Sequence, residues 1–371
     1  MKLDNTDKKL LNIIQAEVSL SREPFAALGL RLDVNGDEII RRIKRLKEEE
    51  IIRQIGPVFN PRRLGYQTTL VAMKAATGLL DEASQIISAH PLVSHCYKRD
   101  HDFNFWFTLA MPAKEDLESE VQKLGNRIKA DATLNLPAVK VFKIGAYFNL
   151  GEGDSRPPLR AFTFPSLRAK RGNLISLPHQ DCHRAYAPCN DNKRSYPSAS
   201  DVSIEHSNSL NADSGLLSID RAVINELQQD LPLIERPFDS MSAKLSINVG
   251  EFLSYCQALS QHRIMRRFSA SINHNKLGFT ANAMACWKVP PDMVDSAGKK
   301  MATFPEVSHC YARQTSSLWP YNLFAMIHAD SKNANKVIAS KISAETKLDK
   351  NDLVLLFSTR EIKKVRVRYP V

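Results

Sequence analysis

Hydrophobic residues recur at helical spacing three times near the start of the chain. Asp4 is a typical helix N-cap, Pro24 suits the first turn of a short helix, and a third helix is predicted from about Asn35. The apolar positions of the first and third helices are Leu10, Leu11, Ile14, Val18, Ile39, Ile40, Ile43 and Leu46. Residues 51–59 then alternate between apolar and polar positions, as a strand does. Three helices and a small β-wing predict a winged helix-turn-helix over residues 1–60.

The hydrophobic pattern changes after residue 60, where strand-like and helix-like stretches follow one another. Alternating positions predict strands at 66–76, 93–99, 103–111 and 139–148, and helical spacing predicts helices at 79–90 and 114–129. The resulting order, β-α-β-β-α-β, is that of the ferredoxin-like split βαβ fold. We therefore predict a ferredoxin-like domain over residues 61–150.

Both patterns occur a second time later in the chain. Pro24-Phe25 matches Pro237-Phe238, and residues 51–66 match 264–279, at one constant offset of 213. The sequence therefore predicts a tandem duplication of class α+β. Its second copy comprises a winged helix-turn-helix over 216–273 and a ferredoxin-like domain over 274–371.

Residues 151–215, between the two copies, have low hydrophobicity and no sustained period, which is typical of a partly disordered linker. The linker contains His179, Cys182, His183 and Cys189, at spacings that match no standard zinc pattern. We interpret them as incidental linker residues.

Composition places the chain among folded proteins without a membrane span. Hydrophobic residues make up 43% and charged residues 25%, both ordinary values. The first residues include no apolar run of a secretory signal, and no stretch approaches the roughly 20 apolar residues of a membrane helix. Six cysteines in 371 residues do not form a disulfide framework, so a cytoplasmic location with free thiols is expected.

The formal net charge of +11 divides unevenly, with +3 in residues 1–150, +1 in 151–215 and +7 in 216–371. A basic balance suits nucleic acid, an anionic membrane or a polyanionic small molecule, so charge alone does not choose. The third helix, residues 35–50, carries five basic and five acidic residues, and its match at 248–263 has only Arg263 against Glu251. Because DNA affinity depends largely on phosphate neutralisation, DNA is an unlikely partner and these helices are expected to act as scaffold or lid.

The most specific motif is a repeated run, Val-Ser-His-Cys-Tyr-x-Arg, at residues 93–99 and 307–313. On a strand, His95, Tyr97 and Arg99 share one face, and so do His309, Tyr311 and Arg313. Each face offers a proton donor, a phenol and a guanidinium that binds carboxylates through two hydrogen bonds. A lone strand histidine is more often a half-buried residue with one backbone partner, but recurrence within a repeated motif favours a functional role.

The residues after the motif differ between the copies. Asp100-His101 follows the first, whereas Gln314 and an insertion with Trp319-Pro320 follow the second, so His101 has no counterpart. His101 is a candidate second acid or base, or a candidate iron ligand, and a solvated turn histidine is the alternative. The two sites are therefore expected to be unequal.

A winged helix-turn-helix followed by a ferredoxin-like domain resembles the plan of the Lrp/AsnC regulators, and residues 39–53 are similar to their recognition helix. A narrower resemblance lies in the run His95-Cys96-Tyr97-Lys98-Arg99-Asp100-His101-Asp102-Phe103-Asn104-Phe105-Trp106-Phe107, which is similar to a motif of sirohaem (siroheme) decarboxylases. Cys96 stands where that motif has Asn, and Phe105 where it has Leu. Residues 309–313 and 319–328 resemble the partner subunit, so the chain resembles both subunit types fused.

The resemblance implies that the chain removes CO2 from the two acetate side chains, at C12 and C18, of sirohaem, giving 12,18-didecarboxysirohaem. This reaction belongs to haem biosynthesis by the alternative route, or to the haem of nitrite reductase. Losing CO2 leaves a carbanion beside the macrocycle, which must act as electron sink while an acid supplies a proton. No cofactor is expected beyond the iron carried by the tetrapyrrole substrate.

The resemblance also implies residue roles. Catalysis is expected from His95, His101 and His309. The residues expected to bind substrate are Arg53, Arg63, Tyr97, Arg99, Asn104, Trp106, Arg266, Tyr311, Arg313 and Asn322. For the wing arginines a solvated position is the alternative, and for Trp106 a place in the core.

Two other functions stay open on the sequence. One is an Lrp/AsnC-type transcriptional regulator that binds DNA, and the other is a haem-sensing or haem-carrying protein without turnover. Ferredoxin-like domains of this type usually pair sheet to sheet, so we expect an internal pseudo-dimer, with a homo-oligomer as a further option.

Overall fold

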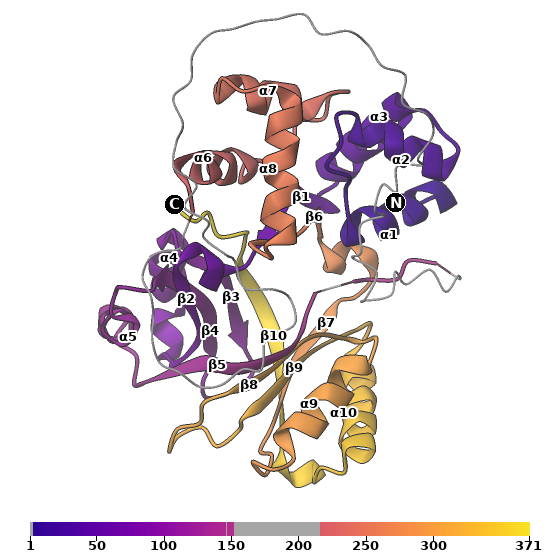
Figure 1. Ribbon diagram of the computed structural model, residues 1–371. Coiled ribbons are helices and arrows are strands. Elements are labelled where there is room, and N and C mark those ends of the chain that lie inside the picture. Colours follow the sequence, from indigo (N-terminus) through magenta and orange to yellow (C-terminus); the bar gives the residue numbers. More distant parts are fainter. Residues whose placement is uncertain (1–2, 146, 152–215) are drawn as a thin grey trace, which may run out of the picture. The chain divides into compact units, whose positions relative to one another are not determined.

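The computed structural model describes residues 3–145, 147–151 and 216–371 (Figure 1). The predicted linker, with His179, Cys182, His183 and Cys189, lies outside the described residues except for Gly151. We call residues 1–150 the first copy and residues 216–371 the second copy. The duplicated α+β plan is confirmed, because both copies have the same order of elements.

Each copy begins with three helices and a strand. In the first copy these are α1 (Asn5–Ala16), α2 (Pro24–Leu32), α3 (Gly36–Glu48) and β1 (Ile52–Phe59). In the second they are α6 (Ser218–Leu227), α7 (Pro237–Lys244), α8 (Val249–Gln261) and β6 (Met265–Ile272). The predicted N-caps are present, since Asp4 forms a capping box with Asp7 and Asn35 accepts from the Glu38 backbone.

Strand β1 does not pair within its own helix-turn-helix, as a wing would. It pairs antiparallel with β6 of the second copy, with Ile52 opposite Ile272 and Ile55 opposite Ala270. The buried side of this ribbon joins one hydrophobic core with the helices of both copies. Strands β1 and β6, which were predicted as wings, therefore join the two copies. Their apolar side chains are buried in the hydrophobic core that the helices of both copies share.

Each copy continues with the predicted β-α-β-β-α-β order. In the first copy the elements are β2 (Tyr66–Lys74), α4 (Leu80–Ala89), β3 (Val93–Arg99), β4 (Phe105–Pro112), α5 (Leu117–Arg127) and β5 (Ala132–Ile144). In the second they are β7 (Ala281–Trp287), α9 (Val294–Thr303), β8 (Val307–Arg313), β9 (Leu323–Ala329), α10 (Lys332–Thr346) and β10 (Leu353–Lys364). Short 3-10 turns are η1 (Pro61–Leu64), η2 (Thr77–Leu79), η3 (His274–Leu277) and η4 (Lys350–Asp352).

The eight strands β2–β5 and β7–β10 close into one barrel in the order β10-β3-β4-β2-β5-β8-β9-β7. Strands β5 and β10 belong to both sheets: β5 pairs with β2 and then with β8, and β10 pairs with β7 and then with β3. Closure leaves no strand edge of the two copies unpaired at this junction. The expected sheet-to-sheet pseudo-dimer is thus built by exchange of the last strand.

The exchanged strands are also where the prediction of element bounds is least accurate. A strand was predicted at 139–148, whereas β5 begins at Ala132 and ends at Ile144. Because β5 changes partner sheets midway, it lacks the one continuous buried face that alternation requires, and Val139 is 54% exposed.

Two kinds of core flank each sheet. Cys96 lies with Ile87 and Val121 in the layer between the first copy's sheet and its helices, and Cys310 lies with Met301 in the equivalent layer of the second. A further cluster from both copies, including Trp106, fills the space between the two sheets. None of the described helices is long and apolar enough to cross a membrane.

Candidate active site

The repeated motif lies on β3 and β8, and its two faces separate as the alternation predicts. Cys96 and Cys310 face the helices, so the histidine, tyrosine and arginine of each motif face the interior of the barrel. His95 is opposite Lys364 on β10, and His309 is opposite Ile144 on β5. Each histidine accepts or donates one hydrogen bond through Nδ1 with the preceding serine Oγ, at 2.8 Å for Ser94 and 2.9 Å for Ser308.

A hydrogen-bonded chain extends from His309 in the second copy only. Ser308 Oγ also lies 2.8 Å from His328 Nε2, and His328 Nδ1 lies 2.5 Å from Asn282 Oδ1. The ring of His274 lies 5.0 Å from that of His328, and Lys364 Nζ donates to His274 Nδ1 at 3.0 Å. Phe148 stacks on His274 at 5.3 Å and covers this end of the group.

Sequence reasoning missed His274, His328 and Lys364. At the matching positions the first copy has Pro61 and Ala110, so a search for repeated residues passes over both histidines. A usable signal existed for His328, because it alternates with Met326 and Phe324 on the inward face of β9. No sequence signal pointed to His274, which lies in the 3-10 turn after β6.

The pKa values of these histidines lie well below the ordinary value of 6.5. Burial, aided by Lys364 and Arg53, lowers the pKa of His95 to about 4. Burial, His328, His95 and nearby cations lower the pKa of His309 to about 3. His95 and His309 therefore lie close enough to influence each other, and both are neutral at pH 7. Neither histidine has a pKa near neutrality, the range in which a general acid works best at pH 7.

Basic side chains gather around the two histidines. Arg53 and Lys364 lie near His95, and Arg267 and Lys364 lie near His309. Arg266 lies near Tyr311, and Arg366 lies near Arg267. Arg53 pairs with Glu361 at 2.6 Å, whereas the other four form no ion pair within the described parts of the chain. Burial is the largest cause that lowers the pKa of Lys364 to about 8 and that of Arg366 to about 10, and the nearby carboxylates Glu361 and Asp230 offset only part of this lowering.

The strand beside each histidine makes the two sides of the site unequal. Tyr97 is opposite Glu361, whereas Tyr311 is opposite Val141. The position of Lys364 beside His95 is taken by Ile144 beside His309. The side around His95 therefore has a carboxylate, Glu361, and an ammonium, Lys364, on the neighbouring strand. The side around His309 has neither at the matching positions, and its polar contacts come from the His328–His274 group.

Arg99 and Arg313 lie deeper and are related by the internal symmetry. Arg99 Nη1 donates to the Leu356 carbonyl at 2.8 Å, and Arg313 Nη1 donates to the Leu136 carbonyl at 2.7 Å. Both guanidinium groups stack on the motif tyrosine, and burial lowers the pKa of each to about 10. Their Nε atoms are buried without a hydrogen-bond partner, so each retains a donor.

Three of the residues predicted to contact substrate form hydrogen bonds within the protein. Asn104 binds the backbone of Ala75 through both ends of its amide, and Asn322 binds Val289 in the same way. Trp106 is 1% exposed and donates to the Phe103 carbonyl at 2.6 Å. The asparagines fix the turns that follow β2 and β7, and the indole belongs to the core, which was the alternative for this aromatic.

The structure does not bring His101 to the other histidines. About 13 Å of strand separates His95 from Arg99, and the chain turns to His101 beyond that end. His101 Nδ1 accepts from the Phe103 backbone at 3.0 Å, and its ring meets Trp319 edge-on at 5.5 Å. Among the described residues, no group of three His, Cys, Asp or Glu side chains is placed to hold a metal ion. Arg63 is exposed on η1, and its side chain forms no hydrogen bond or ion pair with another described residue.

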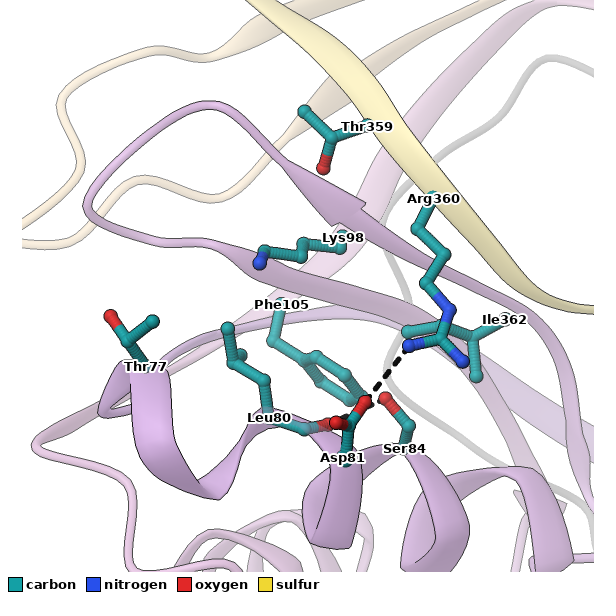
Figure 2. Close-up of a pocket in the computed structure, with 9 residues that line it drawn as sticks. All are labelled: Thr77, Leu80, Asp81, Ser84, Lys98, Phe105, Thr359, Arg360 and Ile362. Carbon is teal, nitrogen blue, oxygen red and sulfur yellow. Dashed lines mark hydrogen bonds and ion pairs between the residues drawn. The ribbon is translucent and has the colours of Figure 1, made fainter.

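Two cavities lie near this region. One of about 840 Å³ is lined by Leu3, Lys8, Glu49, Ile51, Asn149, Leu150, Lys276, Leu277, Gly278 and Phe279. Its wall residue Phe279 packs on Phe148 at 5.1 Å, and Phe148 in turn contacts His274 and His328. The other, of about 370 Å³, lies on the outer face of β3 (Figure 2). The first has the size of a large ligand's pocket and adjoins the histidine chain.

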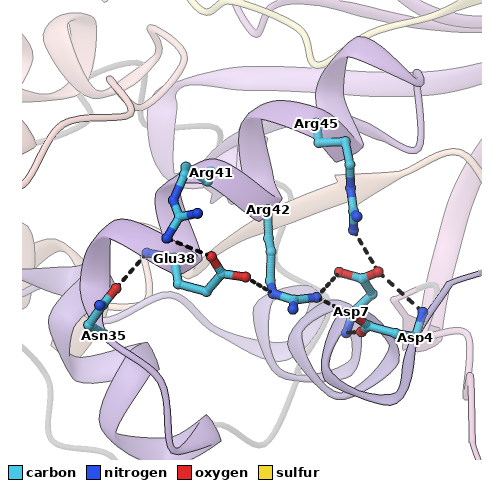
Figure 3. Close-up of polar contacts among 7 residues, drawn as sticks. All are labelled: Asp4, Asp7, Asn35, Glu38, Arg41, Arg42 and Arg45. Atoms are coloured by element: carbon cyan, nitrogen blue, oxygen red, sulfur yellow. Dashed lines mark hydrogen bonds and ion pairs between the residues drawn. The ribbon is translucent and has the colours of Figure 1, made fainter.

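The three arginines of helix α3 are held by acids of the same copy (Figure 3), whereas Lys47 pairs with Asp230 of the second copy. Arg42 binds Asp4, Asp7 and Glu38 at 2.7–2.8 Å. Arg45 binds Asp7, and Arg41 binds Glu38. These ion pairs oppose the use of this helix for phosphate contacts, in agreement with its balanced charge.

Comparison with known proteins identifies both halves of each copy. The AsnC-like ligand binding domain matches residues 63–143 and 276–363, and the siroheme decarboxylase NirDL-like HTH domain matches 7–53 and 220–266. The chain is 33% identical to a siroheme decarboxylase of Hydrogenobacter thermophilus over 99% of this chain and 96% of that protein. It is 39% identical, over 40% of its length, to 97% of a siroheme decarboxylase beta subunit of Methanosarcina barkeri.

A solved structure is similar over nearly the whole chain. It is the siroheme decarboxylase NirDL in complex with an iron-uroporphyrin III analogue, with a TM-score of 0.64 and 30% identity. The match covers 99% of this chain and 95% of that one. The duplicated pairs of domains and the full-length matches both agree with two subunit types fused in one chain.

Proposed function

This chain belongs to the siroheme decarboxylase family, and we propose that it decarboxylates sirohaem on the barrel face that carries His95 and His309. The substrate positions are the acetate side chains at C12 and C18, and the product is 12,18-didecarboxysirohaem. The reaction serves haem biosynthesis. The iron is part of the substrate, and we expect no further cofactor.

The excess of partly desolvated cations around the histidines is the observation that carries the site assignment. Arg266, Arg267, Lys364 and Arg366 form no ion pair within the described residues, and burial lowers their pKa values even though Glu361 lies near Lys364 and Asp230 near Arg366. Burying unpaired cations destabilises a protein unless a ligand supplies the counter-charge. A tetrapyrrole with several carboxylates supplies it, and arginine binds carboxylates with two parallel hydrogen bonds.

The chemistry needs an acid and an electron sink. When the bond from the acetate methylene carbon to its carboxylate breaks, CO2 leaves and the electron pair stays on the methylene carbon. The conjugated macrocycle takes up that charge, and a proton delivered to the carbon gives a methyl group. His95 and His309 are the proposed proton donors, one for each acetate.

Substrate carboxylates would correct the low pKa values of the free protein. In the absence of substrate, burial is the main reason that His95 and His309 are neutral, and the influence of nearby cations adds to it. Carboxylates bound to Lys364 and Arg267 would cancel this influence and favour the imidazolium form. The acid would therefore be charged only when substrate is present, which suits proton delivery to a carbanion.

We propose that the helix-turn-helix domains act as scaffold, since Asp4, Asp7 and Glu38 hold the arginines of α3, and strands β1 and β6 link the copies. Arg53 comes from β1, so this ribbon also contributes to the site. The four cysteines in the described residues are free and buried, which agrees with work in the reducing cytoplasm.

The test is anaerobic incubation of the full chain with sirohaem, followed by mass spectrometry. Loss of two CO2 is expected from the wild type and from Lys299→Ala, an exposed control on α9. His95→Ala and His309→Ala should each lose at least one of the two decarboxylations, with a rate loss of about 10²-fold or more. Unchanged sirohaem with folded wild-type protein refutes the function, and full activity in both variants refutes the site.

A further inference from the structure

The outer face of β3 carries a lysine that the catalytic face does not use. Lys98 is half-buried and projects into the cavity of about 370 Å³ between α4 and β10 (Figure 2). It makes no hydrogen bond or ion pair with any residue that the structure describes. The cavity therefore contains a cation whose counter-charge the protein does not supply.

The lining of this cavity combines hydroxyl groups with an apolar floor. Thr77, Ser84 and Thr359 bring hydroxyls, and Leu80, Phe105 and Ile362 bring apolar side chains. At the rim, Arg360 pairs with Asp81 at 2.9 Å, so these two charges cancel. The remaining charge at the cavity is that of Lys98.

The second copy shows that the fold does not need this cavity. The register that places Lys98 beside Arg360 places Ala312 beside Lys140, and the rim ion pair recurs between Lys140 and Asp295 at 2.6 Å. Gly298 occupies the place of Ser84, at the same offset of 214 as the repeated motif.

Phe142 fills the space in the second copy that stays open in the first. A Cβ built on Gly298 would lie 2.4 Å from the Phe142 ring, so the ring takes the room that the Ser84 side chain has. Ile362 is the matching, smaller residue on β10. The two copies share one fold but differ at this position. The first copy has an open cavity with a cation, and in the second copy the equivalent space is filled and carries no unpaired charge. The cavity is partly open to solvent, since the lining residues Thr77, Thr359 and Arg360 are exposed. The first copy keeps this accessible space beside an unpaired lysine whereas the second copy fills it, which indicates a ligand.

We propose that this cavity binds a small carboxylate with a short apolar chain. The Lys98 ammonium holds the carboxylate, the hydroxyls of Thr77 and Thr359 complete its hydrogen bonds, and the chain lies on Leu80, Phe105 and Ile362. A volume of about 370 Å³ lies at the lower end of the range for ligand pockets, which limits the ligand to a compact metabolite.

The bound carboxylate also acts on the catalytic face. Lys98 and Arg360 form one register pair of β3 and β10, and Tyr97 and Glu361 form the next pair on the opposite face. A ligand that fixes Lys98 therefore acts through a single layer of strands on the side chains around His95. This second part rests on the proposed decarboxylase function, whereas binding itself does not.

The binding test uses hexanoate, with hexan-1-ol as the uncharged match, on the substrate-free full chain. Calorimetry or ligand-observed NMR should show saturable hexanoate binding to the wild type and binding at least about tenfold weaker for Lys98→Ala, which copies Ala312. Ile362→Phe, which copies Phe142, should abolish binding, and Lys300→Ala, which removes a pair with Glu345 on the second copy, should leave it unchanged.

Three results would overturn the site: no binding to the wild type, equal binding to all variants, or equal binding of hexan-1-ol. Should Ile362→Phe fail to fold, as judged by circular dichroism, Lys98→Ala decides alone, since it removes only a side chain that lacks partners.

The rate of sirohaem decarboxylation with saturating hexanoate should change by about twofold or more in the wild type and stay constant in Lys98→Ala. An unchanged rate in active enzyme refutes the coupling, and a wild type without any decarboxylation refutes the proposed function while the binding result stands.

Discussion

Lys364 is a cation that acts on all four histidines of the site, and replacing it gives a direct test of the pKa argument. Its ammonium donates to His274 at 3.0 Å and is among the causes that lower the pKa of His95, His274, His309 and His328. Lys364→Met removes the charge and keeps an unbranched side chain of similar length. We expect the pKa values of these histidines to rise, with the largest rise at His274.

The expected rise in the pKa of His274 follows from its contact with Lys364 and from the relative size of the causes that lower this pKa. A unit charge 3.0 Å away contributes about 1.4 kcal/mol even at the dielectric constant of water, which is about one pKa unit. Burial is the larger cause of the fall from 6.5 to about 3, so Lys364 accounts for less than half of the lowering. The variant should therefore raise the pKa of His274 by roughly one to two units.

The assay is a pH titration of the histidine ring signals by NMR on the unliganded protein. Lys363→Met is the matched control, because Lys363 is the next residue on β10 but binds the His90 carbonyl on the outer side. This control should raise the pKa of His90, which Lys363 helps to lower, and leave His274 unchanged. An unchanged or lower pKa of His274 in folded Lys364→Met would refute the reasoning.

Three further predictions concern stability. The native pKa values of His95, His274 and His309 lie below 6.5, so the unfolded chain binds more protons than the native protein between about pH 3 and 6.5. Stability should therefore increase with pH across that window, and the urea concentration at the unfolding midpoint should rise. A fall of this midpoint with pH would contradict the prediction. Gly298→Ser should lower the free energy of unfolding by about 1–3 kcal/mol, because the new side chain clashes with Phe142. The reverse change in the first copy, Ser84→Gly, should lower it by about 1 kcal/mol or less. Equal losses of stability in urea unfolding would argue against the filled cavity. Arg42→Leu removes one of the two guanidinium partners of Asp7, which is 1% exposed, and should lower the free energy of unfolding by about 2–3 kcal/mol. The exposed control Arg41→Leu should lower it by less than about 1 kcal/mol. Similar losses in thermal unfolding would show that burial of Asp7 does not matter.

Local patterns in the sequence were sufficient for the elements and for half of the site. Helical spacing, the caps at Asp4 and Asn35, and strict alternation predicted the order of elements in both copies, because these features depend on neighbouring residues alone. The same alternation placed His95, Tyr97 and Arg99 on one face of β3. The difference after the motif, at His101 and Trp319, also indicated that the two copies are unequal.

The sequence alone determined the duplicated α+β plan, the repeated His-x-Tyr-x-Arg strand face and a family resemblance. Only the tertiary structure decided that β5 and β10 exchange sheets, that β1 pairs with β6, and that Lys364, His274 and His328 converge on His309. These contacts join residues from different copies or far apart in one copy, so no local period records them. The charge state of the histidines was likewise decided by burial and by neighbouring cations, which exist only once the barrel has closed.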